Sequence, residues 1–162
     1  MTASPRERLA GALAAFSNAD VPKIAAAAGV SALQVANALK GRPVGASAYL
    51  RLCAACGYNP APDLPFPRQP PSDFLFGFFG MGFFVIRGHK KHTDRQAAKI
   101  IEVAPATICR LERGDAVSIG VVLRGCAYIG LSPFAYCAVQ QGALPAAKTQ
   151  KVSRETSSAI PV

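Results

Sequence analysis

The stretch that decides the fold reads TDRQAAKIIEVAPATICRLERG, from Thr93 to Gly114. Its opening T-D-R-Q has the form of a capping box, which predicts a helix that runs through Ile101. Pro105 suits the first turn of a following helix, and a glycine at position 114 suits the left-handed residue that ends it. The stretch therefore predicts two short helices joined by a tight turn.

The same pattern occurs twice in the chain. At an offset of 73 residues, the segment from Asp20 to Pro60 aligns without a gap to the segment from Thr93 to Pro133, and ten of the 41 pairs are identical. In the second copy the identical residues are Ala98, Val103, Gly114, Val117, Leu123, Arg124, Cys126, Ala127, Gly130 and Pro133. Alanine-rich composition does not account for the shared glycines, prolines and Arg-x-Cys pair, so the chain contains two copies of one unit.

Beyond Gly114, the second copy predicts two more helices. Ser118 is expected to cap a helix that runs to about Ile129. Ser132 and the proline after it are expected to open a last helix that ends near Gly142.

The first copy predicts the same scheme without the last helix. Asp20 is the expected cap of its first short helix, residues 29–31 form the turn, and Gly41 follows the second short helix. A third helix is expected from Ser47 to Cys56. The sequence Asn-Pro-Ala-Pro at 59–62 cannot continue as a helix.

Composition divides the chain into four parts. We expect an N-terminal domain over residues 1–60, a Pro-rich linker over 61–73, a C-terminal domain over 74–142 and a flexible tail over 143–162. The periodicity of both domains is helical, so the predicted fold class is all-α, with two tandem small helical bundles.

Two short helices joined by a tight turn and buttressed by others form a helix-turn-helix arrangement. EVAPATICRLERG (102–114) resembles the recognition-helix motif of the Cro/Xre family of phage-repressor-like domains, and GVSALQVANALKG (29–41) resembles a diverged copy. The resemblance implies two tandem helix-turn-helix domains in a sequence-specific regulator of transcription that binds double-stranded DNA in the major groove, first of all a repressor. The alternative is an antitoxin-like adaptor, whose first helix-turn-helix domain binds a partner protein.

The resemblance also implies an internal ion pair. Members of the family often pair an arginine of the first helix with the glutamate of the motif's ending, and the matching residues here are Arg87 and Glu112. In the first copy, Ala14 and Leu39 occupy those positions. The joint loss of both charges avoids an unpaired buried charge.

Helical spacing gives the second short helix of the C-terminal domain two sides. Val103, Ile108 and Leu111 fall on the inward side, whereas the outward stripe consists of Ala106, Arg110 and Arg113. By resemblance, Ala106, Thr107 and Arg110 touch base edges, with Arg110 able to bind guanine through two hydrogen bonds. The candidates for phosphate contact are Lys90, Lys91, Arg95, Gln96 and Arg113.

The first copy has a different set of side chains on the equivalent stripe. Its candidates for DNA contact are Ser31, Leu33, Gln34, Asn37, Lys40 and Arg42. Gln34 and Asn37 suit adenine, and Leu33 suits a thymine methyl group. A duplicated domain that serves in dimerisation or packing instead would have the same residues, so both interpretations stay open.

Charge and cysteine content narrow the function class. The 18 Lys and Arg against 9 Asp and Glu give a formal charge of +9, which favours a polyanionic partner.

Cys53 and Cys56 with His89 and His92 do not have the spacing of a metal site. We therefore expect these cysteines to be core thiols, and we expect neither a metal nor a cofactor. No group of residues has the spacing of a catalytic site, so the chain is not expected to be an enzyme. Five cysteines in apolar, helical stretches indicate reduced thiols and a cytoplasmic location.

The run FLFGFFGMGFFVI, from Phe74 to Ile86, is uncharged over thirteen residues. A membrane span needs roughly 20 residues, so no membrane partner is expected. Gly77, Gly80 and Gly82 are expected to let aromatic rings pack closely. One helix buries only one side, and the surplus apolar surface predicts either a seam between the two domains or a homodimer interface.

Overall fold

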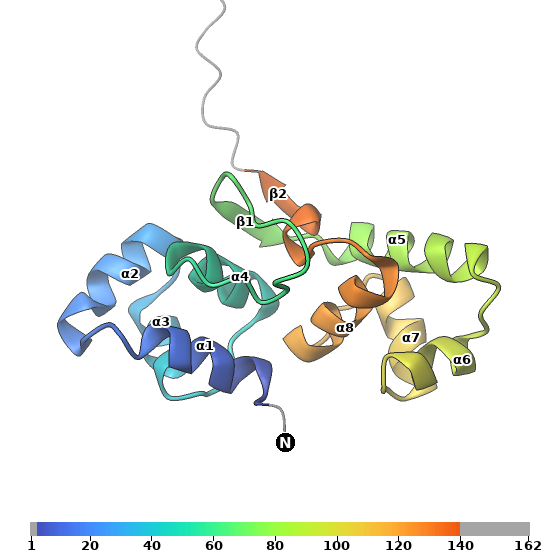
Figure 1. The fold of residues 1–162 in the computed structure, drawn as a ribbon, viewed down its shortest axis with the longest axis horizontal. Helices are drawn as coiled ribbons and strands as arrows, with labels where there is room; N and C mark the ends of the chain where they lie inside the picture. The colour runs from blue at the N-terminus through green and yellow to red at the C-terminus, as the bar shows by residue number, and fades with distance from the viewer. Residues whose placement is uncertain (1–2, 140–162) are drawn as a thin grey trace, which may run out of the picture.

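The computed structural model describes residues 3–139, and this part of the chain is mainly helical (Figure 1). Its α-helices are α1 (Pro5–Leu13), α2 (Val21–Ala28), α3 (Ala32–Leu39), α4 (Ala46–Ala55), α5 (Phe76–His89), α6 (Asp94–Ile100), α7 (Pro105–Glu112) and α8 (Ile119–Ile129). Two 3-10 helices, η1 (Asn18–Asp20) and η2 (Pro133–Tyr136), and two strands, β1 (Pro71–Phe74) and β2 (Cys137–Val139), complete it. The tail expected over 143–162 lies outside the described residues.

The repeat in the sequence is also a repeat of helix positions. Helices α6, α7 and α8 each begin 73 residues after α2, α3 and α4, respectively. The glycines that end the helices, at 41 and 114 and at 57 and 130, all adopt positive φ as expected. Gly29 ends α2 at φ 62°, and its counterpart Glu102 turns the chain at φ 54° although it carries a side chain.

The capping residues only partly match the sequence-based expectations. Thr93 and Gln96 form the predicted capping box at the start of α6. Asp20 does not cap α2, because its carboxylate accepts hydrogen bonds from Ser17 instead. Ser118 stands at the N-cap of α8, but its side chain makes no capping bond. Helix α4 begins one residue earlier than predicted, after Gly45.

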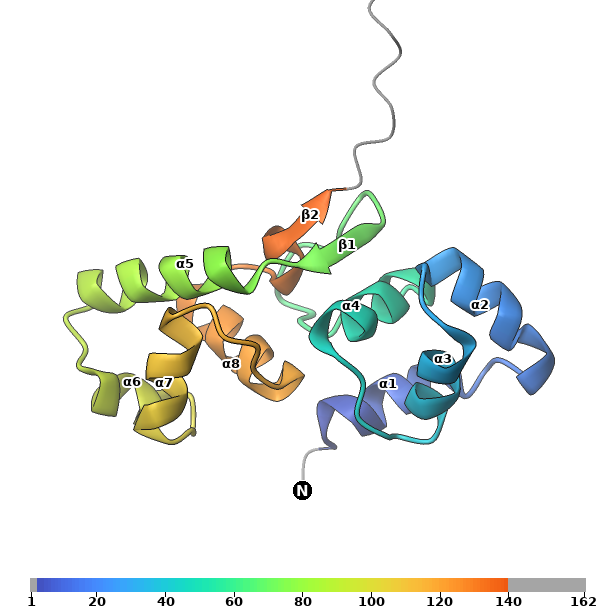
Figure 2. The same cartoon turned by 180° about the vertical axis from the view of Figure 1, so that it is seen from behind.

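The first half of the molecule is built around α1, α2, α3 and α4. Helix α3 packs against α1 and α2, and α2 packs against α4 (Figure 2). Leu13, Val35 and Leu52 are fully buried between these helices. The hydroxyl of Tyr49 donates to the carbonyl of Pro5 at 3.0 Å, which fixes α1 against α4.

In the second half, neighbouring segments pack closely against α5. A Cβ at Gly80 would clash with the carbonyl oxygen of Leu111, so this glycine makes room for the backbone at the end of α7 and not for the expected aromatic ring. A Cβ at Gly82 would meet the ring of Tyr136, which confirms the expected close packing of an aromatic ring there. On α8, Gly125 makes room for the ring of Phe79, which is fully buried.

A two-stranded antiparallel sheet replaces part of the predicted last helix. Phe74 of β1 lies opposite Cys137 of β2, and the amide of Leu75 donates to the carbonyl of Tyr136 at 2.8 Å. The helix expected from Ser132 to Gly142 is therefore wrong over its described part. Residues 133–136 form one short 3-10 helix, and residues 137–139 form strand β2. The helix does not continue because the backbone groups of β2 bond to β1.

Strand β1 also joins the two halves. It packs against α4, where the amide of Phe74 donates to the hydroxyl of Ser47 at 2.9 Å. Arg51 of α4 bonds to Asp73 of β1 at 2.9 Å. The end of the segment expected as a linker thus forms an ordered seam between the halves.

The outward face of α5 takes no part in this seam. Phe78, Met81, Phe84 and Val85 are between 56 and 62% exposed. Among the described residues, no helix is long and apolar enough to cross a membrane.

Candidate nucleic-acid interface

Arg87, near the end of α5, forms the ion pair expected from the family resemblance with Glu112 at the end of α7. Its Nε donates to Glu112 Oε1, and its Nη2 donates to Oε2 at 3.0 Å, so the pair is bidentate. Both side chains are only 14% exposed. The hydrogen bonds from Arg87 to Glu112 raise the pKa of the guanidinium above its usual value.

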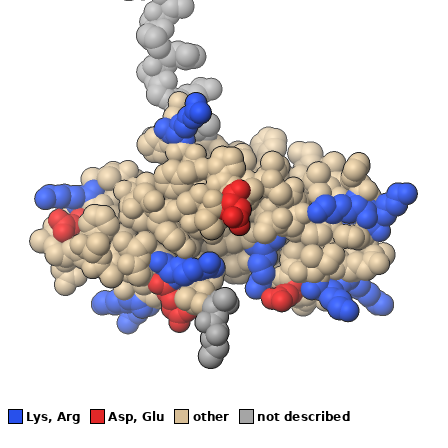
Figure 3. All heavy atoms as spheres, in the orientation of Figure 1, with Lys and Arg blue, Asp and Glu red and all other residues tan. Residues whose placement is uncertain are grey.

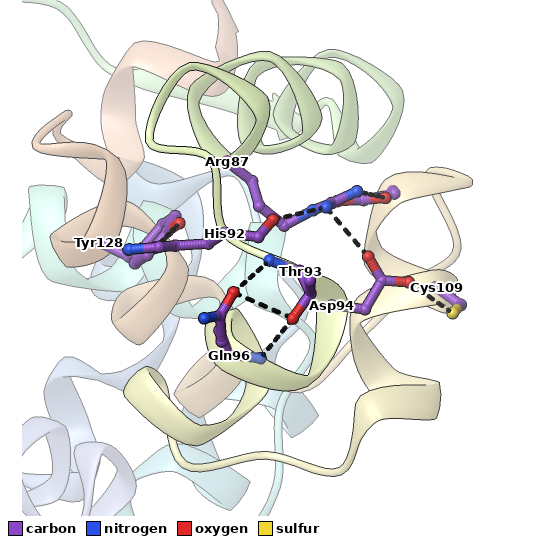
Figure 4. A network of polar contacts seen from close by, with 8 residues as sticks. Arg87, His92, Thr93, Asp94, Gln96, Cys109 and Tyr128 are labelled. Carbon is purple, nitrogen blue, oxygen red and sulfur yellow. Dashed lines mark hydrogen bonds and ion pairs between the residues drawn. The ribbon is translucent and has the colours of Figure 1, made fainter.

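The same guanidinium also holds the loop between α5 and α6. Its Nη1 lies 3.1 Å from Oδ1 of Asp94 and donates to the carbonyl of His92 at 2.9 Å. The ring of His92 in turn lies 2.8 Å from the hydroxyl of Tyr128 on α8 (Figure 4). One arginine therefore ties together the end of α5, the start of α6 and the end of α7. We call this group, Arg87 with Glu112, Asp94 and the His92 carbonyl, the arginine clamp.

Helix α7 presents the two sides that its sequence predicts. Ile108 and Leu111 are buried, and Val103, before the helix, packs against the core. The outward residues Ala106, Arg110 and Arg113 are exposed, and Thr107 is half-buried. The helix begins at Pro105 after Ala104, and no side chain caps it.

Two of the exposed arginines already contact their own chain. Arg110 donates one hydrogen bond from Nη2 to the carbonyl of Ala116 at 3.2 Å. Arg113 forms a 3.1 Å ion pair with Asp115, in which the two side chains are 68 and 45% exposed. Exposed pairs of this kind contribute little to stability, so both guanidinium groups can exchange these partners for others at low cost.

The remaining candidates of the second half lie near the end of α5 and on α6. Lys91, Arg95 and Gln96 are exposed. Lys90 is exposed as well, but its Nζ donates to the backbone carbonyl of Tyr128 at 2.6 Å. The same Nζ lies 4.3 Å from the centre of the Tyr128 ring. Figure 3 shows basic side chains at this end of the molecule and others spread over the rest of the face.

In the first half, helix α3 begins with a closed capping box. The amide of Ser31 donates to Gln34 Oε1 at 2.9 Å, and the amide of Gln34 donates to Ser31 Oγ at 3.2 Å. These polar atoms are therefore engaged within the helix start. Leu33 is 70% exposed, and Asn37 is half-buried.

The two basic candidates of the first half, Lys40 and Arg42, are exposed just after α3. At the positions equivalent to the ion pair, Ala14 is exposed at the end of α1, whereas Leu39 packs against the core.

Sequence reasoning did not anticipate several polar residues near these helices. Arg51 donates to the carbonyl of Gly29 at 2.9 Å, which holds the turn between α2 and α3. Lys99 of α6 is exposed on the same helix as Arg95. Cys109 is exposed on α7, with its Sγ 3.6 Å from Asp94. The shared Arg51/Arg124 pair in the repeat was the signal for the first of these, but its partners could not be inferred.

The cysteines and histidines do not gather in the described part of the chain. No three His, Cys, Asp or Glu side chains among residues 3–139 are arranged to hold a metal ion. Cys53 is buried in the first half, and burial raises the pKa of its thiol. His89 is exposed at the end of α5, in the other half.

Comparisons with protein-family models, curated proteins and solved structures found no match to this chain.

We predict that replacing Glu112 with alanine lowers the free energy of unfolding by about 3–5 kcal/mol, because it leaves the guanidinium of Arg87 without its bidentate partner. Asp115→Ala is the matched control. It breaks an exposed pair and is expected to cost less than about 1 kcal/mol. Urea unfolding of both variants, of Arg87→Ala and of the double variant measures the coupling. Additive losses for Arg87→Ala and Glu112→Ala would mean that these side chains do not interact energetically.

Proposed function

We propose that this protein is a transcriptional regulator of the helix-turn-helix type, most simply a repressor, that binds double-stranded DNA. The observation that carries the proposal is helix α7: its outward face is exposed and carries Arg110 and Arg113, and its inner side is held by the arginine clamp. A helix that enters the major groove must be both accessible and fixed in orientation. The net charge of +9 supports a polyanionic partner.

In this proposal, Arg110 reads a base and its neighbours hold the backbone. A guanidinium has five N–H donors, and Arg110 uses one of them on Ala116. Four remain, and two of these can bind O6 and N7 of guanine. Ala106 and Thr107 lie one turn earlier on the same helix, beside the next bases. Phosphate contacts come from Lys91 and Arg95, together with Arg113, Gln96 and Lys90.

The first half offers fewer exposed side chains that suit contacts with bases. Asn37 is half-buried, and the capping box engages Oγ of Ser31 and Oε1 of Gln34. The side-chain NH2 of Gln34 has no such bond, as in Gln96. Lys40 and Arg42 are exposed and suited to phosphate. We therefore assign sequence discrimination mainly to α7, and added affinity to the first half.

One observation favours a second candidate function, that of an adaptor. Leu33 is 70% exposed in the outward first turn of α3, and an exposed leucine suits a protein partner as well as it suits a thymine methyl group. In that case the first half binds a partner protein. Loss of partner capture in a Leu33→Ala variant that keeps full DNA affinity would support the adaptor function.

The proposal predicts DNA binding that weakens steeply as salt concentration rises, because each phosphate contact releases counterions. A plot of log affinity against log salt is expected to be linear, with a slope of about −0.9 for each phosphate contacted. Replacing Arg95 with glutamine is expected to reduce the magnitude of the slope by about 0.9, the contribution of one phosphate contact. Arg68→Gln, at an exposed position in the segment between the halves, is the control and leaves the slope unchanged. Absence of binding at low salt, or a flat salt response, contradicts the proposed function.

The proposal also predicts unequal roles for α7 and α3. Arg110→Ala is expected to relax preference at one base pair and to cost about 1–3 kcal/mol on a selected DNA site, whereas Asn37→Ala costs less. Selection of sites from random duplexes, followed by footprinting of both variants, measures this. A larger loss of discrimination from Asn37→Ala would make α3 the reading helix.

A further inference from the structure

We propose that the outward face of α5 is a homodimer interface, in which α5 packs antiparallel against α5 of a second copy across a two-fold axis. This inference does not rest on the proposed DNA binding. The face consists of Phe78, Met81, Phe84 and Val85, flanked by Gly77 and Gly88, and we call it the α5 stripe. Its four large side chains are each more than half exposed.

The α5 stripe is the side of the helix that the fold leaves uncovered. The opposite side carries Phe79, Gly80 and Phe83, which are buried against α7 and α8. Gly77 and Gly88 are exposed, and a Cβ at either would have nothing within 4 Å. Four adjacent apolar side chains on a helix surface form a patch of the kind that marks an interaction site.

The stripe matches itself under a two-fold rotation. The helix runs from Phe76 to His89, so its midpoint falls midway between Met81 and Phe84. If two such helices pack antiparallel about that midpoint, each Met81 lies opposite the other copy's Phe84. Gly77 then lies opposite the other copy's Gly88. A two-fold interface uses the same patch twice, and a methionine beside an aromatic ring with glycines at both ends allows close contact.

Charge selects the antiparallel arrangement and a second copy as the occupant. No charged side chain belongs to the stripe, because Arg87 turns inward to the arginine clamp. Two chains of charge +9 repel each other, so an uncharged face is where they can approach. The cationic residues Lys90 and Lys91 follow the C-terminal end of the helix. Antiparallel packing separates the lysines of the two copies, whereas parallel packing brings them together.

The orientation of Phe84 also suits an interface. The guanidinium of Arg87 lies 5.5 Å from the centre of its ring, so one face of the ring is supported from within the chain. A ring held in place loses little side-chain freedom when a second copy covers it.

Sedimentation equilibrium of the full chain without DNA, over a range of protein concentrations, tests the interface. The unaltered protein is expected to form a dimer, and Met81→Glu to weaken dimerisation at least about tenfold because it buries an unpaired charge. Leu131→Glu, at another exposed apolar position outside the stripe, is the matched control and is expected to leave dimerisation unchanged. Circular dichroism melts of each variant show that the fold is retained.

A mixture of two single variants tests the two-fold geometry itself. When Met81→Glu chains are mixed with Phe84→Lys chains, the glutamate of one chain faces the lysine of the other, so the mixture is expected to associate more strongly than either variant alone. A protein that stays monomeric at every concentration overturns the interface, even if it binds lipid vesicles. A Met81→Glu variant that dimerises as well as Leu131→Glu overturns it too. A mixture that associates no more strongly than either variant alone overturns the antiparallel register.

Discussion

The second half of the molecule depends on the guanidinium group of Arg87. It binds both carboxylate oxygens of Glu112, a carboxylate oxygen of Asp94 and the carbonyl of His92, so three helices share one charged group. A mostly buried charge is costly unless it is paired, and here each of the three guanidinium nitrogens has an oxygen partner. The clamp therefore fixes α7 against α5 in a single orientation, with the inner side of α7 buried and its outer side open.

In the first half, a different arginine holds a different set of contacts. Ala14 and Leu39 replace the charged pair, and Arg51 of α4 instead holds the turn carbonyl of Gly29 and reaches Asp73 on β1. Its Nε is buried without a partner, which makes this clamp less complete than that of Arg87. Because Asp73 belongs to the strand that leads into α5, Arg51 also couples the two halves. In the first half, Arg51 therefore holds a turn and also a contact between the two halves.

The sequence predicted those features that local physics determines. Capping residues, helix-ending glycines and the 73-residue repeat located the starts of α6, α7 and α8, and helical spacing separated Ile108 and Leu111 from Arg110. It missed contacts between distant segments. Nothing local in residues 137–139 indicates pairing with 71–74, and apolar spacing at 74–86 does not show which side of the helix a neighbour covers. Likewise, the sequence shows that Lys90 is basic, but its hydrogen bond to the carbonyl of Tyr128, 38 residues away, depends on the fold.

In this account, a clamp that orients α7 leaves its outer face for DNA, while the α5 stripe on the far side of α5 is left for a second copy. Chemical-shift mapping of the isotope-labelled protein with a duplex carrying a selected site tests this most directly. The account predicts that the largest changes fall on α7 around Ala106 and Arg110 and on the start of α6, with smaller changes on α3. Changes concentrated on the α5 stripe, with α7 unaffected, would contradict it.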